Sequence, residues 1–226
     1  MNFLKISSIV LAVLSILSCG SSKVIYNSTA LSQENWVVEQ QPEGTVEFNN
    51  NSMEITDAEG CTVWFKYQLK GAVKIEYDVI VIDAGGKYDR VSDLNCFWMA
   101  NDPTSPNDFF KNSEQRQGKF TNYHALLQYY VGYGGHNNTK TRFRRYNGNE
   151  NRPLLPEHDL SDKKFMIVPN KTIHIILIAN TSEVKYIRNN KVVFNFQDDN
   201  PYTEGYFGIR TVNNHLKVFN LIITQL

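Results

Sequence analysis

The alternation of hydrophobic and polar residues predicts a protein made of many short β-strands. It is clearest in residues 73–83, where every second residue from Val73 to Val81 is large and apolar. The pair Asn189-Asn190 separates two further strands and suits a two-residue hairpin turn, because asparagine tolerates positive φ. This spacing favours a sandwich or a barrel, and we predict an all-β, two-sheet antiparallel β-sandwich. The other predicted strands cover residues 36–39, 52–56, 62–68, 93–100, 126–133, 140–146, 172–179, 183–188, 191–196, 206–212 and 215–224.

The strands 126–133 and 140–146 lie around a glycine-rich loop and concentrate phenol, imidazole and guanidinium groups. Side chains alternate across a strand, so Phe143 is predicted to face the core. The opposite, exposed face carries Gln128, Tyr130, Arg142 and Arg144. Such a face suits an anionic ring-shaped ligand, with an acidic sugar as the leading candidate; a solvated face with surface ion pairs is the alternative.

Two long connections, 101–122 and 148–164, flank these strands. Loops of this length are usually functional or disordered. We predict that they form the walls of a cleft over a sheet containing residues 93–100, 126–133 and 140–146; ordinary surface loops are the alternative.

The beginning of the chain resembles a bacterial lipoprotein signal. A short apolar run ends in Ile16-Leu17-Ser18-Cys19, which resembles a lipobox. We expect residues 1–18 to be the signal peptide, 19–30 the lipid anchor and tether, and 31–226 the sandwich domain. Acylation of Cys19 would anchor the protein in the bacterial cell envelope, at the outer membrane, with the side it faces left open. A plain signal peptide with a chance cysteine is the alternative.

Charge and cysteine content narrow the possible partners. Lys plus Arg and Asp plus Glu both number 23, so no overall field points to nucleic acid or to an anionic membrane surface. Besides Cys19 there are only Cys61 and Cys96, which form either a disulfide or two buried thiols. No cofactor is predicted. Structural calcium at Asp83, Asp89 and Asp93, or at Asp198, Asp199 and Glu204, is weighed against turn-forming acids.

Several segments resemble lipoproteins of Bacteroidetes polysaccharide-utilisation loci that have a concanavalin A-like sandwich. The resemblance covers about residue 30 to the C-terminus. It implies β-elimination at a uronic acid of an ulvan- or rhamnogalacturonan-type oligosaccharide, by a dehydratase or a polysaccharide lyase. The segments are Tyr77-Asp78-Val79, Asp89-Arg90-Val91-Ser92-Asp93-Leu94-Asn95-Cys96-Phe97-Trp98-Met99, Tyr130-Val131-Gly132-Tyr133-Gly134-Gly135, Arg142-Phe143-Arg144-Arg145-Tyr146, Arg152-Pro153-Leu154-Leu155-Pro156-Glu157-His158-Asp159 and Tyr202-Thr203-Glu204-Gly205-Tyr206-Phe207-Gly208.

The chemistry of elimination assigns roles to the residues of the predicted face. Arginine neutralises a uronate carboxylate through its bidentate fork, so we assign this role to Arg142 and Arg144. Proton transfer is assigned to Tyr130 and His136. The arginines are expected to favour either ionisation of Tyr130 or a neutral imidazole at His136 or His124. His124 is the reserve candidate for proton transfer. Substrate binding is further assigned to Asn95, Gln128 and Tyr146.

Less demanding roles compete with each assignment. Tyr130 suits stacking on a sugar ring, His136 a turn cap and His124 a structural hydrogen bond. The loop sequence Glu157-His158-Asp159 is a secondary candidate. Two other classes remain open: a non-catalytic lipoprotein that captures acidic glycans, and a structural subunit without saccharide affinity.

Overall fold

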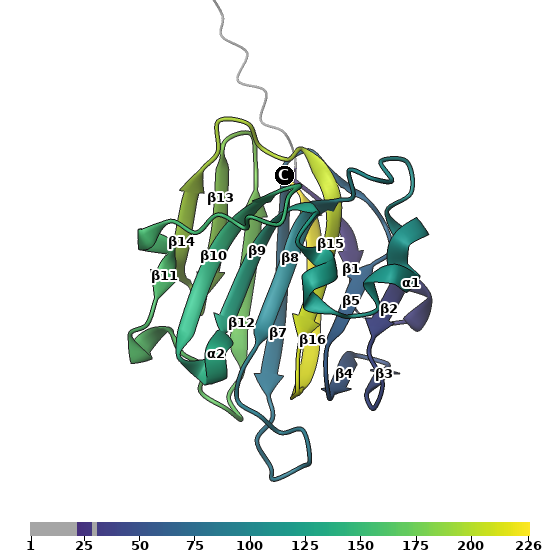
Figure 1. Ribbon diagram of the computed structural model, residues 1–226, viewed down its shortest axis with the longest axis vertical. Coiled ribbons are helices and arrows are strands. Elements are labelled where there is room, and N and C mark those ends of the chain that lie inside the picture. The colour runs from purple at the N-terminus through teal and green to yellow at the C-terminus, as the bar shows by residue number, and fades with distance from the viewer. Residues whose placement is uncertain (1–21, 29–30) are drawn as a thin grey trace, which may run out of the picture.

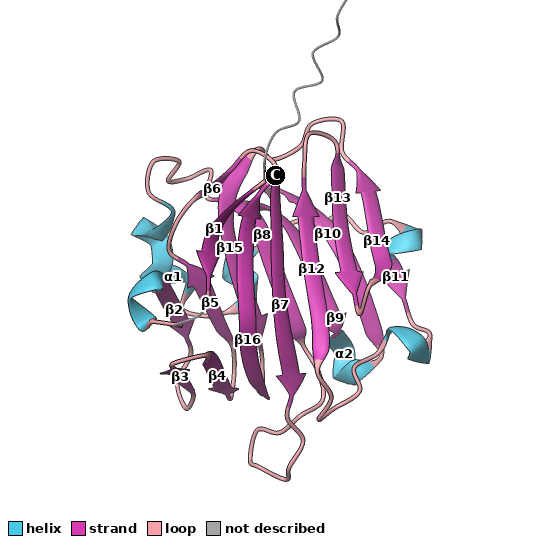
Figure 2. Ribbon diagram, turned by 180° about the vertical axis from the view of Figure 1, so that it is seen from behind, coloured by secondary structure: helices cyan, strands magenta, loops and turns pink. Residues whose placement is uncertain are grey.

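The computed structural model describes residues 22–28 and 31–226, whose strands form two antiparallel sheets packed face to face (Figure 1, Figure 2). This confirms the predicted β-sandwich. The front sheet of Figure 1 has the order β11 (Asp159–Leu160), β10 (Lys140–Asn147), β9 (Leu127–Gly134), β8 (Leu94–Asn101), β15 (Glu204–Thr211), β5 (Cys61–Phe65), β2 (Trp36–Gln40), and β6 (Leu69–Lys70) pairs with β15. The back sheet has the order β14 (Lys191–Gln197), β13 (Glu183–Arg188), β12 (Ile173–Ala179), β7 (Val73–Val81), β16 (Asn214–Gln225), β4 (Ser52–Asp57), β3 (Thr45–Asn49), and β1 (Lys23–Asn27) pairs with β16.

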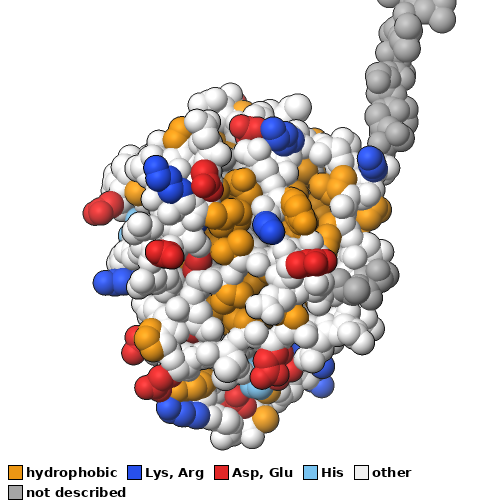
Figure 3. Space-filling model, turned by 90° about the vertical axis from the view of Figure 1, so that its right-hand side faces the viewer, with side chains coloured by type: hydrophobic (Ala, Val, Ile, Leu, Met, Phe, Trp, Pro, Cys, Tyr) orange, Lys and Arg blue, Asp and Glu red, His pale blue; other side chains and the backbone are white. Residues whose placement is uncertain are grey.

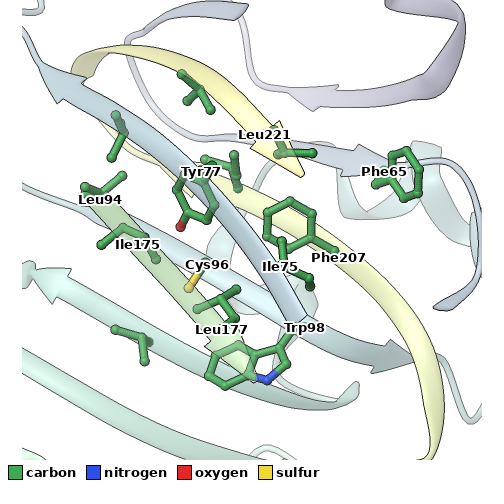
Figure 4. Packing of buried hydrophobic residues seen from close by; sticks show 14 of the residues in the cluster. Phe65, Ile75, Tyr77, Leu94, Cys96, Trp98, Ile175, Leu177, Phe207 and Leu221 are labelled. Atoms are coloured by element: carbon green, nitrogen blue, oxygen red, sulfur yellow. The ribbon is translucent and has the colours of Figure 1, made fainter. Parts of the chain in front are cut away.

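The core lies between the sheets and follows the predicted alternation. Along β7 every second side chain from Val73 to Val81 is buried. Figure 4 shows Cys96 and Trp98 of β8 among apolar side chains of the back sheet. Burial of each large apolar side chain contributes about 1.5–3 kcal/mol, so this layer holds the two sheets together.

The two described cysteines settle the open question of a disulfide. Cys61 and Cys96 are both free and buried. Burial raises the pKa of the Cys96 thiol to about 12, and it also raises the pKa of Cys61 well above its usual value. Both thiols are therefore protonated, structural side chains.

Two local predictions have different outcomes. The hairpin at Asn189-Asn190 is confirmed, because both residues have positive φ, 48° and 62°, between β13 and β14. The tether predicted for residues 19–30 is wrong in part, because Lys23–Asn27 form β1 and pair with the C-terminal strand β16. The signal peptide and Cys19 lie outside the described residues.

The helical elements are short. They are η1 (Gln33–Asn35), η2 (Phe109–Asn112), α1 (Ser113–Arg116), η3 (Phe120–Tyr123), α2 (Gly135–Asn138), η4 (Pro156–His158) and η5 (Lys163–Phe165). None of the helices in residues 22–28 and 31–226 is long and apolar enough to cross a membrane.

The connection between β8 and β9 lies over the front sheet and carries η2, α1 and η3 (Figure 1). Its anchor is buried Arg116, whose guanidinium contacts the Glu39 carboxylate of β2 at 2.7 Å and that of Asp102 at 3.4 Å. The same Glu39 carboxylate accepts hydrogen bonds from Trp64, Ser113 and Tyr123. We call residues 102–126 the cover.

The side of the molecule that carries β1, β2 and β3 has a different character. Figure 3 shows hydrophobic side chains in separate patches there, with charges of both signs scattered among them. Val24 and Ile25 of β1 and Val38 of β2 are among the exposed hydrophobic residues. The concentration of positive charge described next lies on the outer face of the front sheet instead.

Candidate functional site

A groove crosses the outer face of the front sheet beside the cover. Register places Arg142, Gly132, Asn95 and Arg210 side by side on β10, β9, β8 and β15. Two adjoining cavities of about 210 and 240 Å³ share Asp93, Phe120 and Tyr130. The cationic pocket is further lined by Gly132, Gly135, His136, Lys140, Arg142, Arg144 and Arg152. The polar pocket is further lined by Gln41, Glu59, Asn95, Lys119, Thr121, Arg210 and Val212.

The cationic pocket holds more positive than negative charge. Arg142 forms a two-pronged ion pair with Asp159, with Nε–Oδ1 2.9 Å and Nη2–Oδ2 3.2 Å. Arg144 instead donates to the backbone oxygen of Arg152. Unlike Arg142, neither Arg144 nor Arg152 forms an ion pair with a carboxylate of the described chain. Burial lowers the pKa of Arg144, as do the charges of its arginine neighbours. An anionic ligand would supply the missing counter-charge.

A strained turn places His136 at the mouth of the cationic pocket. His136, Asn137 and Asn138 all have positive φ, between 54° and 58°. The Asn138 side chain exchanges hydrogen bonds with the backbone of Ile167, at 2.8 and 2.9 Å, which holds the turn in this conformation. Backbone strain of this kind concentrates at functional sites.

His136 is also bound to one of the predicted carboxylate-binding arginines. Its Nε2 lies 2.7 Å from Nη1 of Arg142. Because a guanidinium has only donors, Nε2 must accept, so the His136 ring is neutral with its proton on Nδ1. The contact thus fixes the tautomer and occupies the lone pair that a general base would use.

Tyr130 lies in the floor shared by both pockets. Only 7% of it is exposed, and its ring packs against Phe97, Phe120 and Tyr146 at centroid distances of 5.3, 5.7 and 5.6 Å. Its hydroxyl lies over Gly132, where a Cβ would come within 2.5 Å of it, so the close approach requires glycine.

The expected ionisation of Tyr130 is wrong. Burial raises the pKa of this phenol well above its usual range, and nearby Tyr146 and Asp93 act in the same direction. The arginines lower the pKa by less than burial raises it. Tyr130 is therefore a neutral hydroxyl that donates a proton or a hydrogen bond.

Three predicted site residues lie under the cover or within it, and they line neither pocket. Gln128 is fully buried and donates to the backbone oxygen of Tyr123, at 3.1 Å, and Tyr146 is fully buried among aromatic rings. His124 belongs to the cover itself and packs edge-on against Phe120. The predicted face is correct for these strands, but the cover occupies this part of it. Tyr130, His136, Arg142 and Arg144 do meet in the cationic pocket, and Asn95 lies in the polar pocket.

Sequence reasoning missed the residues that come from distant segments. Arg210 is only 2% exposed, donates to Thr62 and to the backbone oxygen of Gly118, and faces Phe120. Asp93 was considered only for calcium, yet it lies at the junction of the pockets. A charged residue inside the apolar strand 206–212 was the available signal for Arg210.

Four of the six acids considered for calcium have other partners, namely Asp89, Asp93, Asp198 and Glu204. Asp89 accepts from the amides of Ala84 and Gly86, and Asp198 pairs with Arg145 at 2.6 Å. Among residues 22–28 and 31–226, no cluster of acids, histidines and cysteines that would hold a metal ion is found. The residues of the secondary candidate 157–159 lie in different surroundings. Asp159 pairs with Arg142, while the His158 ring packs against Phe143.

Comparison with known proteins supports the fold and names the family. The chain is similar to a Bacillus subtilis protein of unknown function with a galectin-like fold, with TM-score 0.67 and 15% identity over 88% of this chain and 94% of that one. It is also similar to the carbohydrate binding module CBM66 of Bacillus subtilis (TM-score 0.54, 12% identity, 83% and 93% covered) and to the exoplasmic/lumenal domain of VIP36 in a Ca²⁺/Man3GlcNAc-bound form (0.55, 10%, 86% and 85%). No curated protein matches the chain. The chain belongs to the family described as domain of unknown function DUF6250, which matches residues 55–221.

Proposed function

We propose that this member of the DUF6250 family binds an acidic glycan in the groove and catalyses β-elimination at its uronic acid. The observation that carries the proposal is the cationic pocket, which is lined by Lys140, Arg142, Arg144 and Arg152 and by one carboxylate, Asp93. The neighbouring Asp159 pairs with Lys140 and Arg142, so positive charge remains in surplus. Arginine binds a carboxylate through two parallel hydrogen bonds, so this pocket suits a uronate. The similarity of fold to carbohydrate-binding proteins is consistent with a glycan ligand.

Binding of the ligand's carboxylate would free His136 to act as the base. Arg142 keeps Nε and Nη2 on Asp159 and offers Nη1 to His136. A bound uronate carboxylate competes for that Nη1 proton and frees the lone pair on His136 Nε2. The base is therefore available when a substrate occupies the pocket.

The elimination then uses two groups of the pocket. His136 Nε2 takes the proton from C5, the electrons of that bond form the C4=C5 double bond, and the C4–O bond breaks. The neutral Tyr130 hydroxyl gives its proton to the departing oxygen. The imidazolium afterwards returns a proton to the Tyr130 oxygen through solvent. Arg142 and Arg144 stabilise the negative charge that grows on the carboxylate.

Capture without catalysis is the second candidate function. The burial of Tyr130 among Phe97, Phe120 and Tyr146 favours it, because a packed phenol also serves as a floor for a sugar ring. This function needs the arginines but no proton transfer.

One experiment separates these functions. The protein is incubated with uronate oligosaccharides of the ulvan and rhamnogalacturonan types while the ultraviolet absorbance of the unsaturated uronate is followed, and binding is measured by calorimetry. Growing absorbance supports elimination. Binding without it supports capture, and the lack of both across a broad acidic panel leaves a structural role.

We also propose that Cys19 is acylated and anchors the sandwich to the envelope, at the outer membrane. The motif Ile16-Leu17-Ser18-Cys19 and the nearby start of β1 at Lys23 support a short connection between anchor and domain. The substitution Cys19→Ala should move the protein into the soluble exported fraction. Mass spectrometry of the unmodified protein would overturn this proposal if the mature N-terminus were a residue other than Cys19 and carried no lipid.

A further inference from the structure

We infer that the polar pocket is a second sugar subsite, which accepts an uncharged unit linked to the acidic unit and rejects a second acid. This inference rests on the proposed function, since it takes the acidic unit to lie in the cationic pocket. It adds a site, the path that the bound chain follows across the sheet, and a residue that sets specificity.

The two pockets are parts of one groove. They share Asp93, Phe120 and Tyr130, so a ligand leaving one enters the other. Between Arg142 and Arg210 lie three inter-strand steps, because Gly132 and Asn95 stand between them in register. At a strand spacing of about 4.8 Å these steps span about 14 Å, which leaves room for more than one sugar ring.

The charges of the polar pocket balance. Lys119 and Arg210 are its cations, and Glu59 and Asp93 are its carboxylates, of which Asp93 also pairs with Arg90 at 2.6 Å. The Arg210 guanidinium is already bound to Thr62 and Gly118, at 3.1 and 2.6 Å. Both bonds use Nη1, and Arg210 is only 2% exposed. A second sugar carboxylate here would therefore lie against the carboxylates of Glu59 and Asp93 and gain little contact with Arg210. The surplus of positive charge therefore ends at the cationic pocket.

The other lining groups suit sugar hydroxyls. Asn95 is 3% exposed, and its Oδ1 has no hydrogen-bond partner in the described chain, while its Nδ2 lies a long 3.5 Å from Asp93. Gln41 and Thr121 add an amide and a hydroxyl, which both donate and accept hydrogen bonds. An unsatisfied buried amide oxygen is costly, and a ligand hydroxyl would satisfy it.

Calorimetry with the unmodified protein tests this assignment through three probes. They are methyl glucuronide, a disaccharide of glucuronate and a neutral hexose in either order, and a glucuronate disaccharide with two carboxylates. We expect one of the mixed disaccharides to bind about two- to tenfold tighter than methyl glucuronide, through added hydrogen bonds. The diuronate should gain nothing over methyl glucuronide.

A charge reversal at exposed Glu59 sharpens the test. Glu59→Lys should make the diuronate bind more tightly than the mixed disaccharide, because the polar pocket then carries surplus positive charge. Glu47→Lys on β3 makes the same change of net charge away from both pockets. This control should bind the ligands in the same order of affinity as the unmodified protein.

The outcomes distinguish the two proposals. If methyl glucuronide binds but the neutral unit adds nothing, or if the diuronate binds best to the parent, the second subsite is refuted while the acidic site stands. An unchanged order of ligands in Glu59→Lys would also refute it. If no acidic probe binds, the proposed function fails, and the subsite fails with it.

Discussion

One row of outward side chains crosses the front sheet and ends in two different environments. The row begins at Arg142 and runs through Arg210 and Thr62 to Glu39 on β2. At the Glu39 end the cover closes over the sheet, and Arg116 lies buried against two carboxylates. At the other end, Arg144 lines an open pocket and donates to the backbone oxygen of Arg152.

The comparison shows that an arginine's role is set by what satisfies its donors. Arg116 is saturated by Glu39, Asp102 and the backbone oxygen of Phe109, so it holds the cover in place. Arg144 is half-buried yet has no carboxylate partner among the described residues, which is the condition that favours binding of an external anion.

The largest expected effect concerns Tyr130, which joins the covered and open halves. Tyr130→Phe keeps the packed ring and removes only the hydroxyl. Turnover should fall by about 10²–10⁴-fold, the usual contribution of a general acid, while affinity stays close to the parental value. Steady-state absorbance assays together with calorimetry measure both quantities. Near-normal turnover in this variant would remove Tyr130 from catalysis and leave the binding face untouched.

The next effect concerns the covered half. Glu39→Ala leaves Arg116 without its main partner, and breaking a buried ion pair in this way costs about 3–5 kcal/mol. Urea denaturation should show this loss in the free energy of unfolding. Glu47→Ala on the exposed β3 should change it by no more than about 0.5 kcal/mol. Equal stability of the two variants would contradict the anchoring role of Glu39.

A smaller effect is expected in the open half. Arg144→Ala should weaken binding of acidic oligosaccharides by about ten- to a hundredfold, or about 1.5–3 kcal/mol for a lost charge-assisted hydrogen bond. Turnover should fall as well, because the carboxylate gains charge in the transition state. Lys191→Ala on β14 removes the same charge far from the groove and serves as the control. If both variants lose affinity equally, only a general field attracts the ligand.

The smallest effect, taken over one pH unit, is a pH dependence that originates in the cover. Burial, together with the charges of Arg152, Arg210 and Arg144, lowers the pKa of His124 from 6.5 to about 4. Between these values the unfolded chain binds a proton that the folded protein does not. Stability should therefore fall as the pH decreases from about 6.5 to 4, by at most about 1.4 kcal/mol per pH unit for this group.

The substitution His124→Gln isolates that contribution. Denaturation curves across this range should show a shallower loss of stability in the variant than in the parent. His158→Gln is the comparison variant, because burial also lowers the pKa of His158, whose ring packs against Phe143 outside the cover. A slope in His124→Gln equal to that of the parent would show that the ring is solvated.

The fold was largely predictable because strand alternation is a local property. Residues 73–81 and 140–146 show which side chains face the core without any knowledge of their partners, and Phe143 does face it. The strand β1 was missed because its side chains are mostly exposed and its pairing with β16 spans nearly the whole chain.

The site was predictable only where it is local. Tyr130, His136, Arg142 and Arg144 come from one hairpin and were found together. Arg210 arrives from a strand far along the chain, and the burial of Gln128 depends on how the cover folds over it. The cover is held by single contacts such as that of Arg116 with Glu39, which leave no periodic pattern in the sequence.

The two buried thiols are intrinsic probes of how often the sandwich opens. Cys61 on β5 and Cys96 on β8 lie in the same sheet, and neither has the thiolate character that makes cysteine reactive. A thiol reagent reaches them only when the core opens. Their rates of modification therefore report how often the sheet separates near β5 and near β8, and whether both regions open in one event. Equal modification rates would identify a single cooperative unit. A faster rate at one cysteine would show that the sheet opens more easily near that strand.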